Sequence, residues 1–360
     1  MAFSLKNLSS LLNVAIQHKA SDIHIRTNEV PCLRIRGELV PIQTKVFAPE
    51  DITDIIKILM PGRDNSDLNM KSEIDGAFGI EDLCRVRYNI FRYFGNYGIV
   101  LRVVNTQVPD LGSLDMTKTI SRIALQKRGM ILVTGATGSG KSTTLAAMIN
   151  HINENRGSHI ITIEDPIEYL HPQKMSRVSQ REVGRDTEDF TSGLRSALRQ
   201  DPDVILIGEM RDPITVNIAL KAAETGHVVF STLHTTNTVT TIGRIISMFP
   251  AHEQSEVRKR LAENIYAIIG QRMLAGKNGK TVIAQEIMVT SAGIRDCISG
   301  KDDINRIPSI ISQGQGKSTN GGQTFDQHIM FLYQKGFIEK EVALEAVSSQ
   351  SDFIQKLIVE

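Results

Sequence analysis

The sequence predicts an α/β protein with two domains, a small N-terminal α+β domain and a larger α/β domain that ends in a helical region. The length of 360 residues favours two domains over one. Polar and apolar residues alternate early in the chain, whereas short apolar runs separated by helical stretches follow from residue 130. We therefore place the N-terminal domain at 1–108, a linker at 109–113 and the larger domain at 114–360, with its helical subregion at about 285–360.

The N-terminal domain begins with a predicted amphipathic helix, which strands follow. Five apolar residues recur there at helical spacing: Leu5, Leu8, Leu11, Leu12 and Ala15. Alternating polar and apolar side chains then predict strands at 22–26, 32–36, 84–88 and 97–104. Pro109 and Gly112 indicate the linker.

The larger domain carries short apolar runs at 130–134, 159–163, 204–207 and 228–232. Runs of this kind are typical of strands that are buried on both faces of a parallel sheet. Helical stretches separate them, which favours a parallel α/β arrangement. Beyond residue 285 the pattern is mostly helical, and we expect the polar stretch 312–323 to be a mobile loop.

Composition excludes two classes of protein. Lys and Arg number 41 and Asp and Glu 40, so the net charge of +1 excludes a strongly basic nucleic-acid binder. A hydrophobic content of 41% excludes a disordered chain. No apolar run reaches the roughly 20 residues that span a bilayer, and the amphipathic N-terminus does not resemble a signal peptide. We expect a soluble protein that reaches membranes only through a partner.

The three cysteines, Cys32, Cys84 and Cys297, lie far apart in the sequence, and no CxxC pair occurs. A disulfide framework or a zinc site would need paired cysteines at short spacing. We therefore expect reduced thiols in a cytoplasmic protein.

One segment of the larger domain, Gly135–Ser142, fits the pattern G-x-x-x-x-G-K-[ST]. It follows an apolar run and opens a helix, as a phosphate-binding loop does, and this context disfavours the alternative of a simple glycine turn. Loop N–H groups and the helix N-terminus attract phosphate, the lysine charge reaches the β- and γ-phosphates, and the serine hydroxyl binds Mg²⁺. The predicted residues that bind ATP are Gly135, Ala136, Thr137, Gly138, Ser139, Gly140, Lys141, Ser142 and Thr143.

Acidic residues follow two of the apolar runs, Glu164 after the second and Glu209 after the third. Ligands of parallel α/β sheets bind beyond the carboxyl ends of the strands, so both acids are expected beside the phosphate loop. ATP hydrolysis needs one carboxylate to orient water and another to hold Mg²⁺, and the residues leave open which does which. The alternative for each is a strand-end acid paired with a neighbouring arginine. His234 follows the fourth run and is a candidate contact of the γ-phosphate, although a lone histidine is more often structural.

Together these motifs resemble the PilT/PilU family of type IV pilus retraction ATPases, within the secretion-ATPase superfamily. The matching segments are the opening motif Ala20–His24 with Arg34–Gly37, the Walker A loop Gly135–Ser142, the Asp box Ile163–Tyr169, the Walker B region Leu198–Glu209 and the His box Ala223–His234. The resemblance covers almost the whole chain.

The resemblance implies a homohexamer whose subunits have a PAS-like N-terminal domain and a RecA-like ATPase domain, with ATP bound between them. Domain rotation would then drive a pilus motor. It also implies a cytoplasmic ring that is peripheral at the inner membrane and docks on a pilus platform protein, with a paralogous retraction ATPase as a further partner. Neither nucleic-acid binding nor direct insertion into the membrane is implied.

The resemblance also implies roles for individual residues. Glu164 of the Asp box is the general base, and Glu209 supports Mg²⁺ together with Ser142. The His box brings His227 and His234 to the nucleotide. Arginines of the N-terminal domain complete the phosphate site, and the candidates are Arg85, Arg87 and Arg102. Without the resemblance, these three arginines would be interpreted as solvated strand residues.

One segment departs from the family pattern. Retraction ATPases carry an AIRNLIRE segment, and the matching Gly293–Gly300 keeps only Ile294, Arg295 and Ile298. This leaves an accessory or divergent paralogue as an alternative function. A RecA-like nucleic-acid translocase is disfavoured by the balanced charge. The retained acids argue against a nucleotide-binding regulator without turnover, and the absence of a CxxC site argues against an assembly ATPase.

Overall fold

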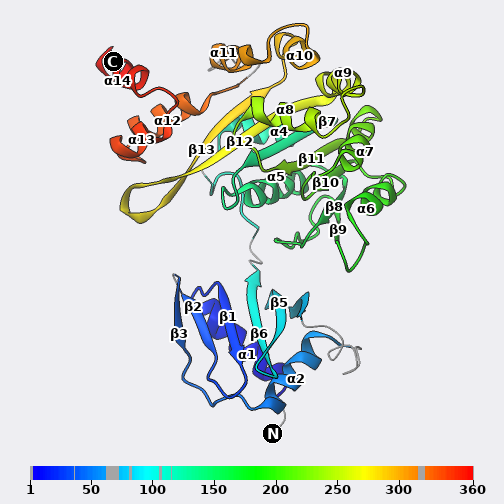
Figure 1. Ribbon diagram of the computed structural model, residues 1–360, viewed down its shortest axis with the longest axis vertical. Helices are drawn as coiled ribbons and strands as arrows, with labels where there is room; N and C mark the ends of the chain where they lie inside the picture. Colours follow the sequence, from blue (N-terminus) through cyan, green and yellow to red (C-terminus); the bar gives the residue numbers. More distant parts are fainter. Residues whose placement is uncertain are drawn as a thin grey trace. The chain divides into compact units, whose positions relative to one another are not determined.

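The computed structural model describes residues 3–35, 37–61, 73–80, 83–104, 108–114, 116–314 and 321–359. The chain divides into two compact units, Met1–Gln107 and Val108–Glu360 (Figure 1). Residues 315–320 of the polar stretch 312–323, which we expect to be a loop, lie outside the described residues, and the first two residues of the stretch end a helix.

The N-terminal unit is an antiparallel sheet with the strand order β3-β2-β1-β6-β5-β4, covered on one face by two helices. Its elements are α1 (Leu5–Gln17), β1 (Asp22–Arg26), β2 (Cys32–Ile35), β3 (Glu38–Pro41), α2 (Pro49–Leu59), β4 (Glu73–Ile80), β5 (Cys84–Tyr93) and β6 (Asn96–Val104). The predicted helix is α1, in which Leu8, Leu11, Leu12 and Ala15 are buried as expected, whereas Leu5 is exposed. β3 and β4 escaped prediction because β3 is exposed throughout and β4 contains two glycines.

The larger unit contains a seven-stranded sheet with the order β13-β12-β7-β11-β10-β8-β9. Its strands are β7 (Gly129–Gly135), β8 (His159–Glu164), β9 (Arg177–Glu182), β10 (Val204–Ile207), β11 (Val228–Leu233), β12 (Ile265–Ala275) and β13 (Thr281–Val289). The predicted runs form β7, β8, β10 and β11, which pair in parallel. The sheet is not wholly parallel, however, because β13 pairs antiparallel with β12 at one edge.

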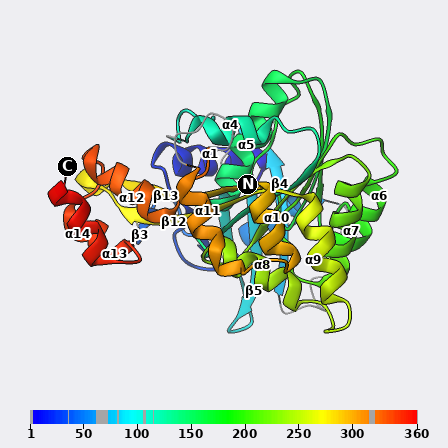
Figure 2. The same ribbon diagram turned by 90° about the horizontal axis from the view of Figure 1, so that it is seen from above.

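Helices cover both faces of this sheet (Figures 1 and 2). One face packs against α4 (Lys118–Ala124) and α5 (Lys141–Asn155). The other face packs against α6 (Phe190–Ala197), α7 (Pro213–Glu224), α8 (Thr238–Ser247), α9 (Gln254–Asn264), α10 (Ala292–Ser299) and α11 (Ile307–Gln313). Two 3₁₀ turns, η1 (Lys277–Gly279) and η2 (Ile304–Arg306), lie in the connections. The predicted α/β class is confirmed.

The C-terminal helices gather around the hairpin of β12 and β13, at the opposite end of this unit from α6 and α7 (Figure 2). They are α12 (Phe325–Gln334), α13 (Lys340–Ala346) and α14 (Gln350–Val359). The helical region begins at Ala292 rather than near residue 285, because β13 extends to Val289. In the divergent segment, α10 ends at Ser299, where Gly300 adopts a left-handed conformation with φ 85°.

The three cysteines are free thiols, as expected. Cys84 is buried, and burial raises the pKa of its thiol to about 11. None of the described helices is long and apolar enough to cross a membrane.

Candidate active site

A cavity of about 460 Å³ opens at the carboxyl ends of β7, β8, β10 and β11. Four segments that are distant in sequence line it: the phosphate loop, the Asp box with the residues that follow, the segment after β10, and the end of β11 with His234. The cavity therefore brings together Lys141, Ser142, Glu164, Glu209 and His234.

The phosphate loop connects β7 directly to α5, as its pattern predicts. Gly140 precedes the helix with φ 84°, a left-handed conformation that favours glycine. At Gly135 a Cβ atom would lie 2.5 Å from the carbonyl oxygen of Gln271, so a larger residue would push the loop away from β12. These constraints hold the loop N–H groups and the start of α5 at the cavity.

Lys141 is buried, and its ammonium donates to the carbonyl oxygens of Gly135 and Ala136, each at 2.9 Å. Burial lowers the pKa of Lys141, and the charges of Glu209 and Glu168 oppose that shift.

Not every predicted loop residue lines the cavity. The lining residues are Thr137, Gly138, Gly140, Lys141, Ser142 and Thr143, whereas Gly135, Ala136 and Ser139 lie in the loop outside this set.

Glu164 ends β8 at the cavity, where neutral donors surround its carboxylate. Its Oε1 accepts hydrogen bonds from Thr162 Oγ1 at 2.6 Å and from Gln180 Nε2 at 3.2 Å. The N–H of Glu168 also donates to the carboxylate. Burial raises the pKa of Glu164, and these hydrogen bonds oppose the shift without cancelling it.

Glu209 has a different environment, because an arginine and a histidine approach its two oxygens. Arg211 forms an ion pair with Oε1, and His234 Nε2 lies 3.4 Å from Oε2. The pairing with a strand-end arginine, which the sequence offered as the structural alternative, is therefore present at Glu209.

The structure places the two candidate histidines at opposite ends of β11. His234 follows the carboxyl end of the strand and lines the cavity. His227 precedes the strand, and the six residues between the two histidines separate them by about 20 Å. His227 lines another hollow with Lys127 and Arg156, and its Nδ1 lies 2.9 Å from the carbonyl oxygen of Ala222. Within this chain His227 therefore does not line the site that was predicted for it.

The three candidate arginines belong to the N-terminal unit, whereas the residues that line the cavity all belong to the larger unit. Arg85 and Arg87 alternate with buried residues on β5, and Arg87 lies directly opposite Arg102 on β6. Arg102 Nε donates to Asp22 Oδ1 at 2.8 Å. Burial acts to raise the pKa of Asp22, but the hydrogen bonds from Arg102 and Ser21 outweigh it and hold that pKa below its usual value.

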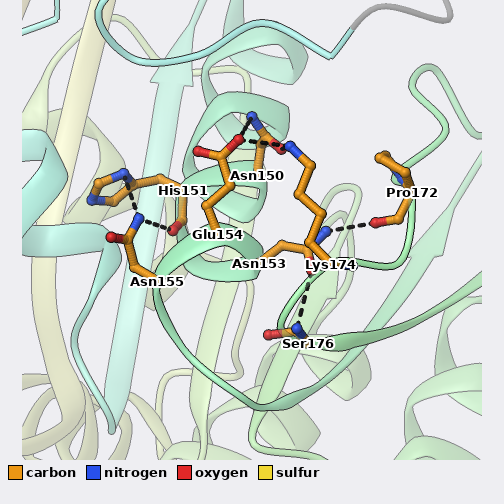
Figure 3. Close-up of polar contacts among 8 residues, drawn as sticks. All are labelled: Asn150, His151, Asn153, Glu154, Asn155, Pro172, Lys174 and Ser176. Atoms are coloured by element: carbon orange, nitrogen blue, oxygen red, sulfur yellow. Dashed lines mark hydrogen bonds and ion pairs between the residues drawn. The ribbon is translucent and has the colours of Figure 1, made fainter.

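Polar contacts from the C-terminal half of α5 hold the loop that follows the Asp box (Figure 3). The buried Asn153 donates to the carbonyl oxygen of Pro172 at 2.7 Å and accepts from the N–H groups of Lys174 and Ser176. Lys174 Nζ also donates to Glu154 at 2.6 Å. The helix that begins at the phosphate loop thus also fixes the loop beyond the Asp box.

Further cavity residues were not assigned roles from the sequence. They are Asp165, Glu168, Tyr169, His171, Phe190, Arg211 and Met273. Tyr169 hydrogen-bonds through its hydroxyl to Thr143 of α5 at 3.0 Å, and burial lowers the pKa of His171 to about 4. Glu168 and Tyr169 belong to the Asp box, which was the available signal for them, whereas Met273 lies on β12, which no motif indicated.

Comparison with known proteins identifies the family. A family profile described as type II/IV secretion system protein matches residues 2–316. The chain belongs to this family. The type IV pilus retraction ATPase PilT of Pseudomonas aeruginosa is 39% identical over 347 residues, which cover 96% of this chain and 100% of PilT. The type IV pilus ATPase PilU of the same organism is 36% identical over 345 residues, which cover 95% of this chain and 89% of PilU.

Solved structures of the family share the fold. The crystal structure of the pilus retraction motor PilT with bound ADP has a TM-score of 0.88 at 38% identity, and the match covers 97% of this chain and 99% of that chain. The ATPase DotB of Legionella pneumophila has a TM-score of 0.80 at 28% identity, covering 100% and 96%. The predicted resemblance to the retraction ATPases is confirmed.

Proposed function

We propose that this chain is an ATP-hydrolysing motor that powers the retraction of type IV pili. One observation carries the proposal: the phosphate loop and two strand-end carboxylates, Glu164 and Glu209, line one cavity. Similarity to retraction ATPases along nearly the whole chain gives the motor its mechanical task.

Mg²⁺ would enter this site together with ATP. Magnesium is usually held by one or two protein oxygens, with phosphate oxygens and water completing its shell. The Ser142 hydroxyl and the Glu209 carboxylate, which line the same cavity, are oxygen donors of this kind. The described residues contain no cluster of three or more His, Cys, Asp and Glu that would hold a metal by themselves. The bound ion would neutralise charge on the phosphates.

The two carboxylates suit different roles. Glu209 forms an ion pair with Arg211 through one oxygen and lies 3.4 Å from His234 through the other, so both of its oxygens already have partners. Glu164 accepts only neutral hydrogen bonds in the contacts above, and burial raises its pKa toward the range in which a carboxylate is an efficient base. Glu164 would accordingly orient the attacking water and take its proton, whereas Glu209 would support Mg²⁺.

The remaining roles concern assembly and force. His234 would contact the γ-phosphate and, through Glu209, respond to its loss. We further propose a homohexamer in which Arg85, Arg87 and Arg102 complete the phosphate site. The ring would act at the cytoplasmic face of the inner membrane, docked on a pilus platform protein and working with a paralogous retraction ATPase. We propose the same domain limits as above, 1–108 and 114–360.

The segment Gly293–Gly300 favours a second candidate function, that of an accessory motor. In this chain α10 ends at Ser299, so its last turn lacks the charged Arg-Glu end of the retraction pattern. A paralogue that assists another retraction ATPase would tolerate this change.

Gene deletion in the host, with pilus counts and twitching motility as readouts, tests the proposal. Deletion is expected to leave surplus, immobile surface pili, which the wild-type gene corrects and a Lys141→Ala gene does not. Loss of surface pili would contradict retraction and indicate assembly. Normal twitching in the deletion strain would contradict a principal motor and favour the accessory role.

A further inference from the structure

Two side chains hold the carboxylate of Glu164 through the same oxygen, and the backbone N–H of Glu168 also donates to the carboxylate. Thr162 Oγ1 and Gln180 Nε2 both donate to Oε1, at 2.6 and 3.2 Å. Thr162 lies two residues earlier on β8 and is fully buried, and Gln180 lies on the neighbouring strand β9. Because both side-chain donors share Oε1, Oε2 keeps more capacity to accept a proton from water.

Gln180 also contacts the loop that follows β8, because both the NH2 group and the oxygen of its amide form hydrogen bonds there. Its Nε2 donates to the carbonyl oxygen of Tyr169 at 2.8 Å as well as to Glu164. Its Oε1 accepts the N–H of His171 at 2.8 Å. The Tyr169 hydroxyl in turn contacts Thr143 of α5 at 3.0 Å. One amide thus ties the carboxylate to the loop after the Asp box and, through that loop, to the phosphate-loop helix.

We propose that Thr162 and Gln180 are positioning residues that fix the orientation of the Glu164 carboxylate, an inference that rests on the proposed role of Glu164 as the base. A general base acts only when its accepting oxygen lies within hydrogen-bond distance of the proton that it takes. Loss of either donor frees the carboxylate to rotate, and misplacement of about 1 Å can slow catalysis about 100-fold.

The same donors influence the protonation of Glu164. Hydrogen bonds to a carboxylate favour its charged form, so removal of a donor adds to the effect of burial, which already raises the pKa of Glu164. The acidic limb of the kcat profile then moves to higher pH. The charged and titratable groups that share the cavity with Glu164 are Lys141, Asp165, Glu168, Tyr169, His171, Glu209, Arg211 and His234. The substitutions below leave all of them in place.

Steady-state ATP hydrolysis by the full chain tests the proposal. Thr162→Val replaces the hydroxyl with a methyl group of similar size, and Gln180→Met removes all of the amide bonds. Each is expected to lower kcat about tenfold or more while KM for ATP changes less than about threefold. Thr162→Ser, which restores a donor, is expected to keep kcat within about twofold of wild type. In Thr162→Val the acidic limb is expected to move to higher pH.

Two matched controls separate positioning from stability. Gln173→Met removes the bonds that tie the same loop to Val178, at 2.8 Å each, without touching Glu164. Ser231→Ala removes a buried hydroxyl bond to Ile207 on neighbouring strands of the same sheet. Both are expected to keep wild-type kcat within about twofold. Equal losses in Gln173→Met and Gln180→Met would overturn the proposal, because loop order alone would then explain the effect.

Glu164→Gln, measured in parallel, separates this proposal from the proposed role of Glu164. Wild-type turnover in Glu164→Gln would show that Glu164 is not the base, whatever the other variants do. A collapse of turnover in Glu164→Gln, with unchanged kcat and pH profile in Thr162→Val and Gln180→Met, would overturn the positioning inference alone.

Discussion

Both ends of the seven-stranded sheet carry a polar hollow, but the helix ends that face the two hollows carry partial charges of opposite sign. At the carboxyl end, a cavity of about 460 Å³ receives the N-terminus of α5, whose free N–H groups attract anions. At the amino end, a hollow of about 360 Å³ lies where α5 and α7 finish, and helix C-termini attract cations. Two basic residues of this second hollow, Arg156 and His227, have local partners.

Two contacts show this compensation. Arg156 follows the last residue of α5 and donates to the carbonyl oxygen of Gln126 at 3.1 Å and to Ser158 Oγ at 2.6 Å. His227 follows α7 and contacts the carbonyl oxygen of Ala222. A basic residue in a hollow is therefore not by itself evidence of a phosphate site. The helix end that faces the hollow decides which charge it attracts.

The largest expected difference between the two ends concerns their glutamates. Glu164→Gln removes the proposed base, and we expect kcat for ATP to fall about 1000-fold while nucleotide affinity is kept. Glu154→Gln, at the amino end of the sheet, breaks an ion pair with Lys174 on the surface and is expected to leave kcat within about twofold. Steady-state kinetics measure both. Similar losses in the two variants would contradict the assignment of catalysis to the carboxyl end.

The next expected effect is on stability, and it comes from a histidine that lies at neither end of the sheet. His328 on α12 is buried and accepts the N–H of Gln285 at 2.9 Å, and burial lowers its pKa to about 4. Between pH 6.5 and 4 the unfolded chain therefore binds a proton at His328 that the folded chain does not. As the pH decreases from 6.5 to 4, protonation of His328 in the unfolded chain should therefore lower the free energy of unfolding by about 3 kcal/mol. Urea unfolding of wild type and His328→Gln would show it as a shallower pH dependence in the variant, and parallel curves would contradict it.

The smallest expected effect on kcat concerns the two histidines that flank β11. His234→Ala removes a neighbour of Glu209 at the cavity, and we expect kcat to fall about tenfold. His227→Ala, at the other end of the same strand, is expected to stay within about twofold of wild type. Assays of the purified protein in its assembled state measure both variants. A larger loss in His227→Ala would show that the amino end takes part in turnover.

The sequence predicted the elements whose pattern is local. The apolar runs that became β7, β8, β10 and β11 are buried on both faces, and the glycine pattern demanded a strand before it and a helix after it. The β12 and β13 hairpin was missed because buried polar residues interrupt it. Gln271 donates to Thr144 at 2.7 Å, and Glu286 accepts from Thr238 at 2.6 Å, so these partners lie in distant segments of the chain.

For the candidate site, too, the sequence indicated the residues that follow a recognisable local pattern and missed those that depend on strand pairing. Glu164, Glu209 and His234 were found because strand ends can be counted along the chain. His227 lies in the same motif as His234, and only the direction of β11 shows that the two histidines are at opposite ends. Thr162 and Gln180 carry no motif at all, since their role depends on the pairing of β8 with β9.

Calorimetric titration of MgATP into two lysine variants tests the central claim, that the carboxyl end of the sheet is the nucleotide site, most directly. Lys141 belongs to the phosphate loop, and Lys127 lines the hollow at the amino end. Lys141→Ala is expected to weaken MgATP binding at least about tenfold, because a charged hydrogen bond to phosphate is lost, and Lys127→Ala is expected to leave the affinity unchanged. Unchanged affinity in Lys141→Ala together with weakened binding in Lys127→Ala would contradict the account.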